Sequence, residues 1–155
     1  MPSLTKFNHP MELNKLIQII STKSEAQDII YALSLIRDGL YQTPPDFKTL
    51  AKKYLPVRFY EKLFVFFETR GIDLEKNQDV TEALDEIIKT VKNLPTLRLI
   101  LSFQPTSSIV ETIQSWLTNH GYKNVLVELS VDYSLIAGAV TQFKGRYDSY
   151  FLLKK

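Results

Sequence analysis

The sequence predicts an α+β protein in which an N-terminal all-helical bundle of about five helices precedes a small C-terminal β-α-β-hairpin unit. Two observations carry this prediction. Apolar residues recur at the helical period of 3.6 through the first part of the chain, and after Pro95 they alternate with a period of two. We therefore expect a helical bundle domain over residues 1–95 and an α/β domain over residues 96–155.

The composition is that of a globular protein without a strong charge. The 155 residues are 45% hydrophobic and 23% charged, and 19 basic against 17 acidic residues leave a net charge of +2. So small a charge favours neither nucleic acid nor an anionic membrane as a partner. The absence of cysteine excludes disulfides, thiolate zinc sites and a cysteine nucleophile. No run approaches the ~20 apolar residues that span a bilayer, and no signal peptide is evident, so we expect a cytoplasmic protein.

Sequence signals mark where the helices begin and end. The first helix starts with Pro10 in its first turn, and Gly39 ends the second. Gly121 follows the last helix, in the place of a C-cap glycine. Three helices carry a capping-box pattern, in which an N-cap side chain and an acidic residue three positions later each accept a backbone N–H: Thr22 with Glu25, Asp79 with Glu82, and Ser108 with Glu111.

One helix, within residues 56–71, is apolar nearly all round. Phe59, Leu63 and Phe67 share one face, while Val57 and Val65 add apolar surface elsewhere. Such a helix lies at the centre of a bundle or is partly covered by a partner. The central position is favoured, because bundles commonly contain one such helix.

Beyond Pro95 the pattern predicts four strands and one helix. The helix, within residues 105–121, connects the first two strands, which should therefore run parallel. Lys144 and Gly145 are expected to form the turn of a terminal hairpin. The predicted strands cover residues 96–103, 124–131, 139–143 and 147–152.

No pattern in the sequence predicts catalysis, a cofactor or a metal site. His9 and His120 are the only histidines and lie far apart in the chain. The five glycines form neither a dinucleotide-binding nor a Walker pattern, and no serine has the flanking glycines of a nucleophile elbow. Asp132 and Asp148 lie at strand edges, where turn-capping is favoured over acid–base chemistry. The aromatic-basic signature of an RNA-binding strand is missing as well.

The stretch VDYSLIAGAVTQFKGRYDS near the end of the chain carries a recognisable pattern. It resembles the C-terminal part of the F-type ATP synthase delta subunit family, which includes the oligomycin-sensitivity-conferring protein. Ala137 replaces the first glycine of a pair in that family, the glycine between the Asp and Ser of a later Asp-Gly-Ser is missing, and the family's usual C-terminal helix is not found. The residues that match are Asp132, Ser134, Leu135, Ile136, Gly138, Gly145, Asp148 and Ser149. The first half is similar to the family's N-terminal helix bundle in architecture only.

The resemblance implies a non-catalytic peripheral-stalk subunit, needed for proton-coupled ATP synthesis or hydrolysis and attached to the inner membrane through its complex. It implies two partners, the N-terminal helices of the alpha subunits for the helical domain and the C-terminal helices of the b subunits for the C-terminal domain. It implies neither nucleic-acid binding nor membrane insertion. By analogy, the alpha-binding groove is placed on Leu13, Leu16, Ile17, Ile20, Leu84, Ile87, Ile88 and Val91.

Two other classes of function stay open. One is a stalk or adaptor subunit of another rotary machine, such as a V-type ATPase or an export apparatus. The other is a small RNA-binding module, whose binding would weaken strongly as salt concentration rises.

Overall fold

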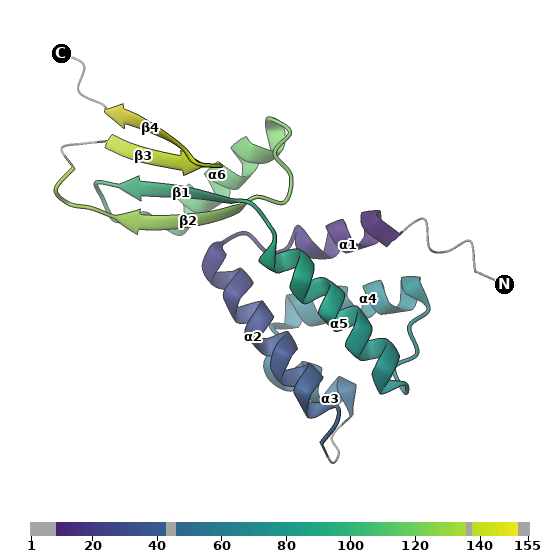
Figure 1. The fold of residues 1–155 in the computed structure, drawn as a ribbon. Coiled ribbons are helices and arrows are strands. Elements are labelled where there is room, and N and C mark those ends of the chain that lie inside the picture. Colours follow the sequence, from purple (N-terminus) through teal and green to yellow (C-terminus); the bar gives the residue numbers. More distant parts are fainter. Residues whose placement is uncertain (1–8, 43–45, 136–137, 152–155) are drawn as a thin grey trace. The chain divides into compact units, whose positions relative to one another are not determined.

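The computed structural model describes residues 9–42, 46–135 and 138–151, which form an α+β fold, as predicted (Figure 1). Helices make up the first part of the chain and strands dominate the last. The elements are α1 (His9–Ile17), α2 (Lys23–Gly39), α3 (Phe47–Tyr54), α4 (Val57–Arg70), α5 (Asn77–Lys92), β1 (Thr96–Leu101), α6 (Ser107–Asn119), β2 (Leu126–Val131), β3 (Gly138–Phe143) and β4 (Arg146–Phe151).

Contacts divide the chain into two compact units. Residues up to 19 together with 26–93 form the first, here called the helical unit. Residues 20–25 together with those from 94 onward form the second, the sheet unit. The division near Pro95 lies where the apolar period changes, but residues 20–25, which the sequence places in the helical domain, belong to the sheet unit. The independence of two domains stays a prediction.

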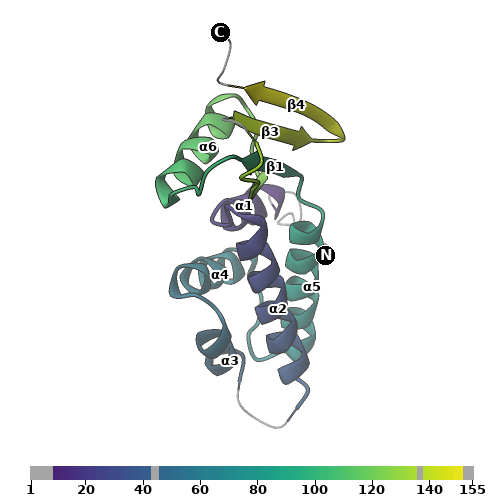
Figure 2. The same ribbon diagram turned by 90° about the vertical axis from the view of Figure 1, so that its left-hand side faces the viewer.

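The helical unit is built around aromatic side chains of α3 and α4. The ring of Phe47 lies 5.3 Å from that of Phe67 and 5.7 Å from that of Phe64. Both α1 and α3 pack against α4. Helices α2 and α5 run side by side (Figure 2), and a hydrogen bond of 2.7 Å from Arg37 to Asp85 joins them.

Helix α4 supplies much of this core, as the sequence favoured, yet part of its apolar surface stays uncovered. It buries Phe59 and Leu63 on its inner face, together with Phe66 and Phe67. Val57 and Val65 are 71% and 52% exposed. Helix α4 therefore combines a core face with an exposed strip, in which Val57 and Val65 flank the exposed Glu61.

The capping-box prediction is confirmed for α2. Glu25 N–H donates to Thr22 Oγ1 at 3.1 Å, and Thr22 N–H donates to Glu25 Oε2 at 3.3 Å. The other two predicted caps are wrong, because each helix starts earlier. The N-cap of α5 is Lys76, so Asp79 lies in the first turn, where a carboxylate interacts favourably with the helix dipole.

At α6 the N-cap is Thr106, and Ser108 lies inside the helix. The hydroxyl of Ser108 is 2.8 Å from that of Thr106 and caps no backbone group at that position. The other end of α6 agrees with the sequence. Gly121 follows the C-cap residue with φ of 81°, and Tyr122 N–H donates to the carbonyl of Leu117 at 2.9 Å.

The sheet unit contains a four-stranded sheet of order β2-β1-β3-β4. Strands β1 and β2 are parallel and connected through α6, whereas β1–β3 and β3–β4 are antiparallel. The predicted parallel pair and terminal hairpin are thus confirmed. Helix α6 lies against one face of the sheet (Figures 1 and 2). Leu99, Leu117, Val125 and Val127 form the core between them.

Candidate partner-binding surface

The side chains that the sequence assigns to an alpha-binding groove all lie in the protein's interior. None of the eight is more than 8% exposed, and Ile20 belongs to the sheet unit, whereas the other seven lie in α1 and α5 of the helical unit. The eight are Leu13, Leu16, Ile17, Ile20, Leu84, Ile87, Ile88 and Val91. The periodic apolar stripe of an amphipathic helix covers its own core first. The placement of an open groove on these side chains is therefore corrected: they are core.

The residues of the delta-like pattern begin in a turn after β2. Asp132 accepts hydrogen bonds from Ser134 N–H at 2.9 Å and from Ser134 Oγ at 2.6 Å. The bond from the Ser134 hydroxyl, followed by that from its backbone N–H, lowers the pKa of Asp132. Leu135 N–H closes the turn on the carbonyl of Asp132 at 3.2 Å. Asp132 thus occupies the turn-capping role predicted for it.

The rest of the pattern lies in the hairpin and does not converge on one site. Gly138 begins β3, and Gly145 adopts a left-handed φ of 79° in the β3–β4 turn. Asp148 pairs with Thr141 and Ser149 pairs with Val140 in the antiparallel register. Ile136 lies outside the described residues. These positions are distributed over two turns and two strands, as expected for residues that determine a fold.

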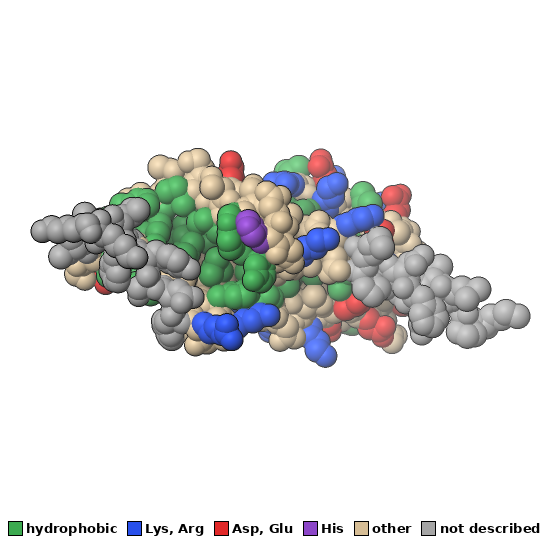
Figure 3. Space-filling model, turned by 90° about the horizontal axis from the view of Figure 1, so that it is seen from above, with side chains coloured by type: hydrophobic (Ala, Val, Ile, Leu, Met, Phe, Trp, Pro, Cys, Tyr) green, Lys and Arg blue, Asp and Glu red, His purple; other side chains and the backbone are tan. Residues whose placement is uncertain are grey.

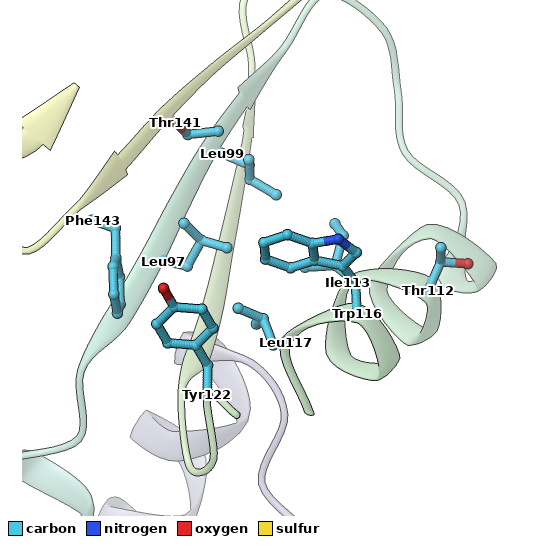
Figure 4. Close-up of a pocket in the computed structure, with 9 residues that line it drawn as sticks. All are labelled: Leu97, Leu99, Thr112, Ile113, Trp116, Leu117, Tyr122, Thr141 and Phe143. Carbon is cyan, nitrogen blue, oxygen red and sulfur yellow. The ribbon is translucent and has the colours of Figure 1, made fainter. Parts of the chain in front are cut away.

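A cavity of about 550 Å³ lies between α6 and the sheet (Figure 4). Its floor is aliphatic: Leu97 and Leu99 come from β1, and Ile113 and Leu117 from α6. Thr112 and Thr141 also line it, together with the aromatic residues Trp116, Tyr122 and Phe143. This volume and apolar lining are typical of a binding site, and the cavity opens on the surface.

A row of aromatic side chains borders this groove. Trp116 of α6 stacks on His120, with ring centroids 4.2 Å apart and planes at 25°. The ring of Tyr122 lies 6.4 Å from that of Trp116, with planes at 13°, and forms a T-shaped pair with the ring of Phe143 of β3, with centroids 5.9 Å apart. These contacts hold the aromatic side chains in place before any partner arrives. Figure 4 shows Trp116, Tyr122 and Phe143 around the aliphatic floor.

Basic residues stand at one end of the groove. Lys123 follows Tyr122, and the ammonium of Lys144 lies 5.4 Å from the centre of the Phe143 ring. Arg146 is the register partner of Phe143, so the two side chains share a face of the sheet. All three basic residues are exposed. On the face drawn in Figure 3, hydrophobic side chains gather into one patch with Lys or Arg side chains along part of its border.

Sequence reasoning predicted the helix that carries Trp116, within residues 105–121, but did not single out this groove. Tyr122 and Phe143 were not singled out because they lie in a loop and a strand that meet only in the folded protein. One signal was present: the chain's one tryptophan lies on a helix that joins two strands. Periodicity alone could not show that this side chain is 53% exposed.

The described residues contain no group of three or more His, Cys, Asp or Glu side chains placed to hold a metal ion. His120 Nδ1 lies 2.8 Å from the carbonyl oxygen of Trp116, which holds its ring against the indole. Within the described ranges, no helix has both the length and the apolar character needed to cross a membrane.

No protein-family model and no curated protein matches the chain. Its function must therefore be inferred from its own residues, the fold they adopt and the pattern in residues 132–149.

Proposed function

We propose that this protein is a peripheral-stalk subunit of an F-type ATP synthase, a static link between the alpha subunits of the catalytic head and the b-subunit stalk. One observation carries the proposal. The described residues that match the delta-subunit pattern fall in order at the turn after β2, the start of β3, the β3–β4 turn and β4. They do so in a sheet unit that follows a five-helix region, the order of elements that the resemblance implies.

Such a subunit acts mechanically. A rotor turning inside the head exerts torque on it, and a stator holds the head against that torque while protons flow. The subunit needs no catalytic group for this task. It needs two separate binding surfaces, and we assign the helical unit to the alpha subunits and the sheet unit to the b subunits. Attachment to the membrane is then peripheral and indirect.

The burial of the predicted groove residues moves the proposed alpha contact elsewhere on the helical unit. Val57 and Val65 are two turns apart on α4, so they lie on the same side of the helix, and both are exposed. An amphipathic partner helix could bury its apolar face along this strip. We therefore place the alpha contact on the exposed side of α4.

Binding measurements with the purified partners test this assignment. Calorimetry of the full chain with a peptide of the alpha subunit's N-terminal helix should show binding with a negative heat-capacity change, as apolar burial requires. Val65→Asp should weaken that binding at least tenfold. Tyr31→Asp, a change at a 67% exposed apolar residue of α2, is the matched control and should leave it unchanged.

A chain that bound neither the alpha peptide nor the soluble part of the b subunit would overturn the proposed function. Unchanged binding of alpha by Val65→Asp would instead refute only the placement on α4. Binding of alpha by the sheet unit would reverse the assignment of partners to units.

A further inference from the structure

We propose that the groove between α6 and strands β1 and β3 binds an acidic amphipathic helix of a partner protein. The inference rests on the proposed function, in that it gives the chemistry of the helix through which a stalk subunit contacts the sheet unit. The evidence for it, however, comes from the groove itself: its shape, the exposure of its apolar side chains and the charges around it.

The groove leaves apolar surface uncovered. Of the residues of α6, all of which are described, only Leu117 is fully buried. Ile113 and Phe143 are half-buried, and Trp116 and Tyr122 are 53% and 45% exposed. Large aromatic side chains gathered at an open apolar site mark a surface for protein binding, and tryptophan and tyrosine dominate the binding energy at such surfaces.

The groove has a helix on one side and a sheet on the other, and its volume of about 550 Å³ suits the apolar side chains along one face of an incoming helix. Trp116 and Tyr122 project over the aliphatic floor formed by Leu97 and Leu99 (Figure 4). An incoming helix would place side chains spaced three and four residues apart against that floor. Because the aromatic row is already stacked, little rotamer freedom is lost when the partner binds.

The charges around the groove select an acidic partner. Lys123, Lys144 and Arg146 stand exposed at the end where α6 finishes and the hairpin turns. One acidic residue also belongs to this part of the sheet, since Asp148 is the register partner of Thr141, which lines the groove. Glu128 bonds to Arg98 on the opposite face of the sheet, where Lys144 lines a small pocket with it, and Glu111 lies toward the other end of α6. Three basic residues against one acidic residue beside an apolar site favour carboxylates on the polar face of whatever binds there.

The same features make single-stranded RNA a poorer ligand for the groove than a helix. Base stacking needs free aromatic faces. In this groove one face of Trp116 is occupied by His120, and the ammonium of Lys144 lies over the ring of Phe143. The aliphatic floor offers no stacking partner, so bases would gain less here than leucine or isoleucine side chains.

The test uses the full chain and its single tryptophan, which lies in the groove. The probes are designed helical peptides of about 20 residues, long enough to hold helical structure in water. One has a leucine stripe and a glutamate face, a second has lysine in place of the glutamate, and a third has serine in place of the leucine. We expect the first to bind with a saturable change in Trp116 fluorescence, the second at least tenfold more weakly, and the third not at all.

A charge-reversed variant makes the test specific. Lys123→Glu, Lys144→Glu and Arg146→Glu together should reverse the preference, so that the lysine peptide binds more tightly than the glutamate peptide. The control variant is Lys52→Glu, Lys62→Glu and Lys89→Glu, which makes the same change in net charge at exposed lysines of the helical unit. It should retain the original preference. Both variants should keep the circular dichroism of the unmodified chain.

Equal binding of the two leucine peptides, binding of neither, or tighter binding of an oligouridine than of the glutamate peptide would each overturn the proposal. The groove and the proposed function can fail separately. If the charge-reversed variant still binds the b subunit as tightly as the unmodified chain, the groove assignment fails and the stalk function stands. If the unmodified chain binds the glutamate peptide but neither alpha nor b, the stalk function fails and the groove stands.

Discussion

The backbone N–H of Val127 donates a hydrogen bond of 3.0 Å to the carbonyl oxygen of Ser21, a residue more than a hundred positions earlier in the chain. Thr22 forms a parallel bridge to Val127 at the same place. The segment between α1 and α2 therefore extends the sheet beyond β2, and residue Thr22 also caps α2. This one short segment therefore both pairs with the edge strand of the sheet and caps the start of α2. A sheet edge that is paired in this way is protected from pairing with other chains.

We expect Gln114→Ala to destabilise the sheet unit. The Gln114 side-chain amide donates to Ser21 O at 2.6 Å and to Val125 O at 3.3 Å. Its removal costs each carbonyl one hydrogen bond, although Ser21 O keeps the bond from Val127 N–H. The free energy of unfolding should fall by about 1 kcal/mol, the typical effect of losing such bonds. Thermal denaturation measures the fall, and amide hydrogen exchange should show faster exchange at Val127. Gln18→Ala, at an exposed position, is the control. Equal melting temperatures for the two variants would contradict a structural role for Gln114.

The sequence predicted this fold well where local signals decide it. The change of apolar period at Pro95 distinguished helices from strands, and the Thr22–Glu25 pair identified the start of α2. Neighbouring polar residues misled the prediction of two other caps, because Lys76 and Thr106 offered earlier starts. A capping pattern shows that a helix begins nearby. Other residues close by can serve as the N-cap instead, so the helix can begin up to one turn away from the predicted N-cap.

Contacts between residues far apart in the chain could not be predicted from the sequence. Nothing local links Ser21 to Val127, so the sheet extension could not be predicted. The apolar stripes of α1 and α5 were identified correctly, but a stripe does not tell whether the protein's own core or a partner covers it. For Ile17 and Ile88, which are 1% and 5% exposed, the core covers them. Aspartate at either position would disrupt folding and could not report on partner binding alone.

Arg70→Lys should destabilise the helical unit although it keeps the charge. The Arg70 guanidinium donates to both carboxylate oxygens of Glu86, at 2.6 and 3.2 Å, and its central carbon lies 4.4 Å from the centre of the Phe66 ring. Lysine cannot reproduce the two-pronged bond or the stacking. We expect a loss of roughly 1 kcal/mol in urea denaturation. Arg58→Lys, at an exposed site on the same helix, should cost almost nothing, and a similar cost for both would refute the special role of Arg70.

The pKa of Asp132 should lie below its ordinary value and should depend on Ser134. The hydroxyl and backbone N–H of Ser134 favour the ionised carboxylate, so the turn gains stability that is present above the unfolded-state pKa of about 3.9 and is lost as the pH falls through the lower folded-state pKa. Ser134→Ala removes the hydroxyl donor, and the pKa of Asp132 should rise toward its ordinary value. A carbon-13 NMR titration of the carboxyl group measures the shift. Ser130→Ala should leave it unchanged, and identical titrations in the two variants would show that the Ser134 hydroxyl is not the cause.

Gly145→Ala should destabilise the hairpin through backbone conformation alone. Gly145 has a φ of 79° and Lys144 one of 49°, the left-handed pair that a two-residue turn between antiparallel strands requires. No atom lies within 4 Å of where a Cβ at Gly145 would stand, so alanine meets no clash and the cost comes from the positive φ. We expect a loss of about 1 kcal/mol by chemical denaturation.

Gly145→Asn is the comparison that isolates this cause, because asparagine tolerates the left-handed region and should lose much less stability than alanine. Lys144→Asn, by the same reasoning, should be neutral or slightly stabilising. If alanine and asparagine at Gly145 were equally harmful, backbone conformation would not explain the glycine. Because this turn also sets Phe143 opposite Arg146, the alanine variant should bind the glutamate peptide more weakly, whereas the asparagine variant should bind it as the unmodified chain does.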